Sequence, residues 1–336
     1  SIPNKMGFDE FYGYNCQRQS HSFYPDHLWH NEEKVLFPEN ENNACKTYSQ
    51  DLIHEQALKF IRDHKEQPFF AMLTYTLPHA ELNLPHDSIY KMYENSFEET
   101  PYIGKFDKVY GGYNTSEKPL ASFAAMVSRL DKYVGDVMAE LKELGLDKNT
   151  IVIFTSDNGP WLTEHENGGS AGPLKDGKGT WWEGGFRVPA ICWMPGKINP
   201  AINDEIMTSM DLYPTFLSMA GIEQPKDLVL DGVNQTGLLF EEKHSARDEV
   251  YYWWGSELMA IRKGEWKYYF KTIKDQYLRT CKIETPAEPL LYNVETDISE
   301  RFNQAEKHPE IVKLLIEAGE KHKKGMKIKP SVCDMM

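Results

Sequence analysis

The middle of the chain reads Thr150-Ile151-Val152-Ile153-Phe154-Thr155, a β-branched apolar run that is stopped by Ser156-Asp157-Asn158-Gly159-Pro160. A short, continuous apolar run of this kind predicts a strand that is buried on both faces. An apolar stripe from Phe123 to Leu144 predicts a long helix just before it. A helix that feeds a fully apolar strand is typical of a βαβ unit, so we predict an α/β fold with a mostly parallel sheet sandwiched by helices.

Further elements are predicted on both sides of this unit. The first fifty residues are loop-like and favour a surface wrap over a hydrophobic layer. Apolar spacing predicts a helix from Gln50 to about Lys65, and the run from Phe69 to Tyr75 predicts a second buried strand. After the central strand, residues 188–194 predict another strand and residues 211–220 a short helix.

The C-terminal part has a different pattern. Strand-like segments near residues 250–254, 258–262 and 266–270, separated by turns at glycines, predict an antiparallel meander. A strand at 290–293 and a helix at 311–321 are predicted after it. We therefore predict a larger α/β domain over residues 1–240 and a smaller C-terminal α+β subdomain, containing an antiparallel sheet, over residues 241–336.

Composition excludes several classes of protein. The 336 residues include 37 lysines and arginines against 51 aspartates and glutamates, a formal net charge of −14. Such a chain repels the phosphate backbone, so we expect no nucleic-acid partner. The longest apolar runs are far shorter than the ~20 residues that span a bilayer, so we expect no membrane partner. The five cysteines lack metal-finger spacing.

Three loops at predicted strand ends carry unusual chemistry, and ligands of α/β sheets bind at such ends. Asp157 and Asn158 offer hard oxygen ligands suited to Ca²⁺ or Mg²⁺, although Asp-Asn-Gly is also a common turn. Lys178, between two glycines, can act as a point charge on an anion or be a solvated surface lysine. His79 can be a proton donor or a structural histidine. Together they suggest ester hydrolysis at sulfur or phosphorus.

These residues stand in a longer pattern. The segments are Phe154-Thr155-Ser156-Asp157-Asn158-Gly159-Pro160, Gly177-Lys178-Gly179-Thr180-Trp181-Trp182-Glu183-Gly184-Gly185-Phe186-Arg187 and Met210-Asp211-Leu212-Tyr213-Pro214-Thr215. They resemble the type I sulfatases, which are arylsulfatase-like, formylglycine-dependent enzymes of the alkaline-phosphatase superfamily. The opening from Gly7 to Tyr14 and the stretch around His79 also look like sulfatase landmarks in the right order. The resemblance covers essentially the whole chain and implies an alkaline-phosphatase-like fold.

The resemblance also implies roles for single residues. Asp157 and Asn158 would ligate a divalent cation, usually Ca²⁺. Lys178 would bind the sulfate and its bridging oxygen, and His79 would contact the sulfate or protonate that oxygen. For Glu183, Arg187 and Asp211 we expect architectural roles, with Arg187 as the partner of Glu183 and Asp211 at a helix N-terminus. The implied compartment is periplasmic, secreted or lysosomal, and the sequence does not decide among them.

The motif that supplies the family's nucleophile is absent from the 336 residues. Sulfatases carry Cys/Ser-x-Pro-x-Arg, whose first residue becomes the formylglycine nucleophile, and none of the five cysteines is followed by this pattern. Ser1-Ile2-Pro3-Asn4-Lys5 has lysine in place of arginine. We therefore expect the chain to be the C-terminal portion of a sulfatase lacking the N-terminal third, with the nucleophile outside it, and to be inactive alone.

The function expected from the resemblance is hydrolysis of a sulfuric ester, with a sulfated carbohydrate or an aryl sulfate as substrate. One alternative is a phosphate or phosphonate ester hydrolase of the same superfamily. Another is a non-catalytic glycan-binding remnant whose aromatic side chains stack on sugar rings. Aromatic residues of this kind also serve as core or loop packing. The candidate aromatics are Tyr24, Trp29, Trp161, Trp181 and Trp182. Polar loop residues can line a carbohydrate subsite or be ordinary exposed loop residues. They are His21, Tyr24, His30, His165 and Glu166.

Overall fold

The computed structural model describes residues 2–104, 113–162, 167–274 and 282–330. Two compact units make up the chain: residues 1–150 with 164–169, and residues 151–163 with 170–336. In the described part, no helix is long and apolar enough to cross a membrane. His165 and Glu166 lie outside the described residues. The division into residues 1–240 and 241–336 stays a prediction.

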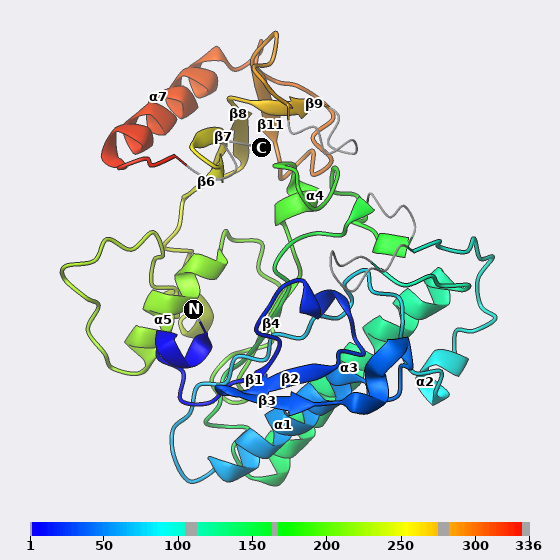
Figure 1. Cartoon of the computed structure of the whole chain (residues 1–336). Helices are drawn as coiled ribbons and strands as arrows, with labels where there is room; N and C mark the ends of the chain where they lie inside the picture. Colours follow the sequence, from blue (N-terminus) through cyan, green and yellow to red (C-terminus); the bar gives the residue numbers. More distant parts are fainter. Residues whose placement is uncertain (1, 105–112, 163–166, 275–281, 331–336) are drawn as a thin grey trace. The chain divides into compact units, whose positions relative to one another are not determined.

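Unit 1 contains two long helices and a small sheet (Figure 1). The helices are α1 (Ser49–Asp63) and α3 (Pro119–Glu143), which match the predicted ones, and α2 (Ser88–Lys91) is a single turn. The first fifty residues form more than a surface wrap. They hold the antiparallel sheet β1 (Tyr12–Gly13), β2 (His27–His30) and β3 (Glu33–Leu36), and the 3₁₀ helices η1 (Pro3–Met6), η2 (Gln19–His21) and η3 (Pro38–Asn43).

A buried arginine ties the helices of unit 1 together. Arg129 of α3 is 4% exposed and donates to Asp51 of α1 at 2.8 Å and to Asp87. Asp87 is also the N-cap of α2, where it accepts the amide of Ile89 at 3.0 Å. Since a buried guanidinium must be paired, this arrangement fixes how the three helices meet over the apolar core around Met126.

The central strand of the sequence begins unit 2 as β4 (Val152–Thr155) and pairs with β5 (Ala190–Trp193). This pair is antiparallel, and so are the other strand pairs among the described residues, so the predicted parallel ladder is not seen there. The predicted buried strand from Phe69 to Tyr75 is wrong, because no strand is formed there and Phe70 and Met72 are 57% and 62% exposed. A strand exists only where a neighbour satisfies its backbone groups.

The predicted C-terminal meander is confirmed. It is a four-stranded antiparallel sheet in the order β11-β8-β7-β6, and α7 (Pro309–Gly325) packs on β7 and β8 through the fully buried Leu315. The strands are β6 (Glu249–Trp254), β7 (Glu257–Lys263), β8 (Trp266–Tyr269) and β11 (Leu290–Asn293). A two-stranded ribbon, β9 (Thr272–Lys274) with β10 (Lys282–Glu284), follows β8.

Short helices connect the strands of unit 2. They are α4 (Glu183–Phe186), η5 (Ser209–Asp211), α5 (Leu212–Met219) and α6 (Thr236–Phe240). The predicted short helix at residues 211–220 is confirmed as α5. Of these elements, α4 matters most for the site, because it closes the glycine-rich loop that carries Lys178.

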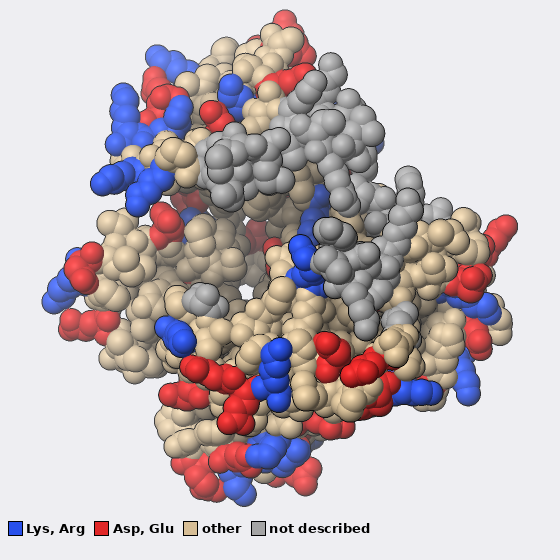
Figure 2. Space-filling model, in the orientation of Figure 1, with Lys and Arg blue, Asp and Glu red and all other residues tan. Residues whose placement is uncertain are grey.

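The surface charge fits the acidic composition. On the face in Figure 2, acidic side chains gather over the part of unit 1 that contains β2, β3 and η3. Basic side chains gather near the end of α7, whose last turn contains His322, Lys323 and Lys324. Cations at a helix C-terminus offset the helix dipole, so this local basic group has a structural cause.

Candidate functional site

Two backbone hydrogen bonds join the loops that carry three of the four predicted site residues. The amide of Lys178 donates to the carbonyl of Pro160 at 2.8 Å, and the amide of Gly159 donates to the carbonyl of Gly185 at 3.1 Å. The turn with Asp157 and Asn158 therefore lies against the loop with Lys178, within unit 2. His79 belongs to unit 1 and is described there.

The glycines of these loops are required by close backbone contacts. A Cβ on Gly159 would lie 1.8 Å from the carbonyl oxygen of Gly184, and a Cβ on Gly177 would lie 2.3 Å from that of Pro160. Both distances are shorter than any real contact, so a side chain at either place would part the loops. Thr180, 4% exposed, closes the turn by donating its hydroxyl to the carbonyl of Gly177 at 2.9 Å.

The Asp157–Asn158 pair fits one part of a cation site. Asp157 is exposed, and among the described residues its carboxylate makes no hydrogen bond or ion pair. The side-chain amide of Asn158 donates to the carbonyl of Gly159 at 3.1 Å. Carboxylate and amide oxygens of this kind suit a divalent cation. The described residues contain no group of three or more His, Cys, Asp or Glu that could hold a metal. Two protein ligands fall short of the ~6–8 oxygens that Ca²⁺ takes.

Lys178 is half-buried, and its ammonium lies 6.0 Å from the ring centroid of Trp161. That distance is at the outer limit of a cation–π contact, so the ring neighbours the charge without neutralising it. No ion pair of Lys178 with a carboxylate is seen in the described part of the chain. The ammonium is therefore available to an anion.

A buried charge network fixes the end of the glycine-rich loop to the C-terminal sheet. Lys267 of β8 is fully buried and donates to the carboxylate of Glu183 at 2.8 Å and to the carbonyl of Trp181 at 2.6 Å. Arg262 of β7 adds a second cation to Glu183 at 3.2 Å. Our expectation that Arg187 pairs with Glu183 is wrong, because the ion pair of Arg187 is with Asp204, at 3.7 Å.

Glu300 completes this network from the other side. Its carboxylate accepts the amide of Glu183 at 2.7 Å and the hydroxyl of Tyr269 at 2.5 Å. Its backbone takes a left-handed φ of 50°, which costs energy for a non-glycine residue and is held by these bonds. Lys175 of the loop donates to the Glu300 carbonyl at 3.3 Å, so both ends of the loop are anchored.

The carboxyl groups of the network differ in their proton affinity. Burial alone would raise the pKa of Glu183, but the cations Lys267 and Arg262 hold it below its ordinary value. Burial raises the pKa of Glu300, and Lys267 and Tyr269 only partly oppose this. Glu183 is thus the ionised partner of the buried cations.

Asp211 lies at the predicted helix N-terminus, but its carboxylate does not cap α5. It is fully buried and accepts two hydrogen bonds from the Nε and Nη2 of Arg247, at 2.9 and 2.6 Å. It also accepts the amides of Thr208 and Val233, both at 2.8 Å. Although burial opposes it, the hydrogen bond from Arg247 keeps the pKa of Asp211 below its ordinary value. The architectural role is confirmed, with Arg247 as the partner that the sequence did not reveal.

In unit 1, His79 lies in a group of three rings. Its ring stacks on His21 with centroids 5.6 Å apart and planes 14° apart, and Tyr113 lies 5.8 Å from His79 and 5.3 Å from His21. All three side chains are half-buried. His30 lies elsewhere, 3.8 Å from Glu10 and with its ring near Tyr12. His30 therefore lies outside the ring group that contains His21.

Several aromatics proposed to stack on sugars are core residues. Tyr24 and Trp181 are 8% and 5% exposed and pack in the cores of their units, so their assignment to a glycan platform is wrong. Trp182 packs on Tyr269, with centroids 4.3 Å apart, and the Lys175 ammonium lies 3.4 Å from its ring. Trp29 lies beside His27 and under Lys34. Of the aromatics proposed to stack on sugars, Trp161 remains as a candidate, and it lies beside Lys178.

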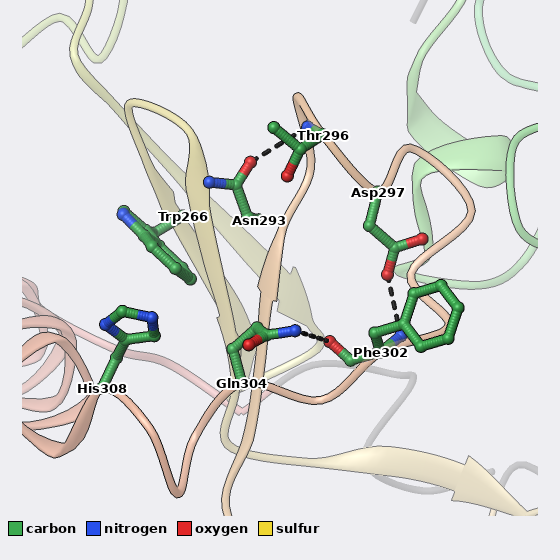
Figure 3. Close-up of a pocket in the computed structure, with 7 residues that line it drawn as sticks. All are labelled: Trp266, Asn293, Thr296, Asp297, Phe302, Gln304 and His308. Carbon is green, nitrogen blue, oxygen red and sulfur yellow. Dashed lines mark hydrogen bonds between the residues drawn. The ribbon is translucent and has the colours of Figure 1, made fainter.

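Unit 2 also contains a cavity of about 400 Å³ (Figure 3). Several of its polar groups bond within the loop: Asn293 accepts the amide of Thr296 at 3.0 Å, and Asp297 accepts that of Phe302 at 2.8 Å. None of the site residues predicted from the sequence lines it. The cavity is lined by Trp266, Asn293, Thr296, Asp297, Phe302, Gln304 and His308.

Sequence reasoning missed Lys267, Arg262 and Glu300. One signal was present: Lys267 stands in Trp266-Lys267-Tyr268-Tyr269, inside a strand that is otherwise aromatic. A charged side chain buried in such a strand is unfavourable unless it has a partner, so Lys267 predicts a buried acidic or polar partner. Glu300 gave no signal, because it lies in a polar loop and its burial depends on where α4 packs.

Comparison with known proteins agrees with this arrangement. Residues 2–222 match the sulfatase family model, and residues 245–336 match the model described as the C-terminal region of aryl-sulfatase. The chain belongs to the sulfatase family.

Two curated relatives and one solved structure are similar to the chain. An arylsulfatase of Hemicentrotus pulcherrimus is 30% identical over 85% of this chain and 49% of its own length. An N-acetylgalactosamine-6-sulfatase of Canis lupus familiaris is 32% identical over 80% and 49%. Among solved structures, Ps i-CgsB superposes with a TM-score of 0.74 at 26% identity, over 96% of this chain and 68% of that one.

The superposition confirms the predicted alkaline-phosphatase-like α/β fold with a smaller C-terminal α+β part. The family generally uses a divalent metal and a formylglycine. The chain spans about half the length of the curated relatives it matches.

Proposed function

We propose that this chain carries the sulfate-binding part of a sulfuric ester hydrolase that acts on a sulfated carbohydrate. The observation that carries the proposal is the pair of hydrogen bonds that sets Lys178 beside the Asp157–Asn158 turn, at 2.8 and 3.1 Å. A lysine held next to a carboxylate and an amide oxygen offers both a point charge for an anion and ligands for a hard cation.

The proposal gives each residue a task. Lys178 binds a sulfate oxygen and the oxygen that bridges to the leaving alcohol, where negative charge develops. Asp157 and Asn158 hold a divalent cation, which we take to be Ca²⁺ and which when bound polarises the sulfate oxygens. For His79 we keep the role from the sequence motif, contact with the sulfate or protonation of the bridging oxygen.

A sulfated sugar is proposed as the substrate because of the relatives. The canine relative is named for N-acetylgalactosamine 6-sulfate, and it matches 80% of this chain. The 336 residues contain no Cys/Ser-x-Pro-x-Arg, so the formylglycine nucleophile of the family has no source within them. We therefore propose that the chain binds the sulfate ester and does not turn it over by itself.

The test is a binding and turnover experiment on the purified chain. N-Acetylgalactosamine 6-sulfate is titrated with and without Ca²⁺ and followed by saturation-transfer NMR, and hydrolysis of an aryl sulfate is measured in parallel. We expect binding that Ca²⁺ strengthens, no turnover, and loss of binding in Lys178→Ala. Lys197→Ala, an exposed lysine of the same unit, is the matched control. Binding that survives Lys178→Ala, or turnover by the chain, would contradict the proposal.

A further inference from the structure

We infer that His21 and Tyr113 form, with His79, a subsite of unit 1 for the sugar ring of the sulfate ester. This inference rests on the proposed function, and it adds the residues that would contact and recognise the sugar ring. The evidence is the group of three half-buried rings, whose centroids lie 5.3 to 5.8 Å apart.

The rings come from three separate segments of the chain. His21 ends η2, His79 follows the Thr76–Pro78 turn, and Tyr113 precedes the bridge between Tyr102 and Ser116. Apolar packing alone does not explain why these three segments present polar rings to one another. A cluster of this kind is better suited to a ligand with both C–H faces and hydroxyl groups.

A buried carboxyl holds Tyr113 in place. Glu81 is fully buried and accepts two bonds from the residue after Tyr113: the Asn114 amide at 3.2 Å and the Asn114 side-chain nitrogen at 2.9 Å. Because Glu81 lies two residues after His79, this clamp fixes the distance between the His79 and Tyr113 segments.

A second support joins the other two segments. The Tyr14 hydroxyl donates to the carbonyl of Ser22, next to His21, at 3.1 Å, and accepts the side-chain amide of the fully buried Gln50 at 3.2 Å. The carbonyl of the Gln50 side chain in turn accepts the amide of Thr76 at 3.3 Å. The His21 and His79 segments are thus held by one relay, and the rings are set before any ligand arrives.

The chemistry of the rings favours a sulfated pyranose. The faces of imidazole and phenol rings accept the C–H face of a sugar. Imidazole nitrogens and a phenol hydroxyl can donate to and accept from sugar hydroxyls. His21 and Tyr113 are therefore specificity-determining residues in this account.

The test uses imidazole resonances of the 336-residue chain and three probes. Unsulfated N-acetylgalactosamine tests the ring group, inorganic sulfate tests the sulfate-binding residues, and N-acetylgalactosamine 6-sulfate carries both chemical groups. We expect the unsulfated sugar to shift the ¹H–¹³C resonances of His21 and His79 and to leave those of His30 unchanged. His30 is the matched control because it lies outside the ring group.

Variants measure the contribution of each ring. In His21→Ala and Tyr113→Ala, affinity for N-acetylgalactosamine 6-sulfate should fall roughly three- to tenfold, the loss typical of one aromatic contact, while affinity for inorganic sulfate stays unchanged. Tyr113→Phe keeps the ring, so its affinity for N-acetylgalactosamine 6-sulfate should fall less than that of Tyr113→Ala. His30→Ala should bind as the wild type does.

The outcomes separate this inference from the proposed function. Unsulfated sugar that leaves His21 and His79 unshifted, or variants that weaken sulfate and sugar sulfate equally, would overturn the subsite. If the unsulfated sugar binds at these rings but the chain does not respond to sulfate, the proposed function is overturned and the subsite is supported. The wild-type shifts need no substitution, so a variant that fails to fold does not remove the test.

Discussion

The backbone amide of Lys178 donates to the carbonyl of Pro160 at 2.8 Å, so the loop that offers a cation and the turn that offers a carboxylate share one hydrogen bond. Neither loop has a strand or helix of its own at this point, and their mutual position depends on backbone contacts that only glycine permits. The site is therefore most sensitive to changes that separate these two loops.

Gly159→Ala should separate them. The new Cβ would lie 1.8 Å from the carbonyl oxygen of Gly184, so the loops must shift, at a cost of roughly 1–3 kcal/mol in the free energy of unfolding. Sulfate binding should be lost as well. Gly135→Ala is the control, because its Cβ meets nothing within 4 Å on helix α3, and it should stabilise the protein by about 0.5–1 kcal/mol. Urea denaturation measures both, and equal effects would contradict the account.

Lys267→Met should destabilise the chain strongly. It would leave the carboxylate of Glu183 with Arg262 alone and the carbonyl of Trp181 with one donor fewer, which typically costs about 3–5 kcal/mol for a broken buried pair. Lys243→Met removes a lysine that is paired with Glu241 on the surface and should change the free energy of unfolding by less than about 1 kcal/mol. Similar losses in the two variants, by chemical denaturation, would show that the buried network does not anchor the loop.

Glu81 should make stability fall as the pH rises above 4.5. Burial raises the pKa of Glu81 to about 7 in the folded protein, against an ordinary value of 4.5, although Asn114 partly opposes this. The folded state then holds a proton that the unfolded state releases between these two values, so the contribution is complete below pH 4.5 and is lost by pH 7. Each unit of pKa difference corresponds to about 1.4 kcal/mol.

The variant Glu81→Gln isolates this effect. Its free energy of unfolding, subtracted from that of the wild type at each pH, removes the titration of all other groups. The free energy of unfolding of the wild type should fall relative to that of the variant as the pH rises from 4.5 to 7. Above and below this range the difference should stay constant. A difference that does not vary with pH would mean that Glu81 titrates normally in the folded chain.

Local patterns predicted most helices and the C-terminal meander, because amphipathic spacing and glycine turns depend only on residues that are close together in the sequence. The segment from Phe69 to Tyr75 has the composition of a strand and yet forms none, since a strand also needs a partner, which composition does not supply. The antiparallel pairing of β4 with β5 could likewise not be predicted, because the pattern of a single segment does not specify its partner strand.

The candidate site divides in the same way. Asp157, Asn158 and Lys178 were found because their loops follow a recognisable motif, and the structure brings those loops together. Arg247 and Glu300 were missed because their role depends on contacts with Asp211 and Glu183, which lie 36 and 117 residues away in the sequence. The stacking of His21 on His79 is a contact of the same long-range kind.

The most direct test of the central claim is a titration of the chain with inorganic sulfate, followed at the indole N–H resonance of Trp161. The Trp161 ring lies 6.0 Å from the Lys178 ammonium, so an anion bound there changes its surroundings. We predict a saturable shift in the wild type that Ca²⁺ strengthens, the same shift in Lys197→Ala, and none in Lys178→Ala. A wild-type Trp161 that does not respond, or a full response in Lys178→Ala, would contradict the account.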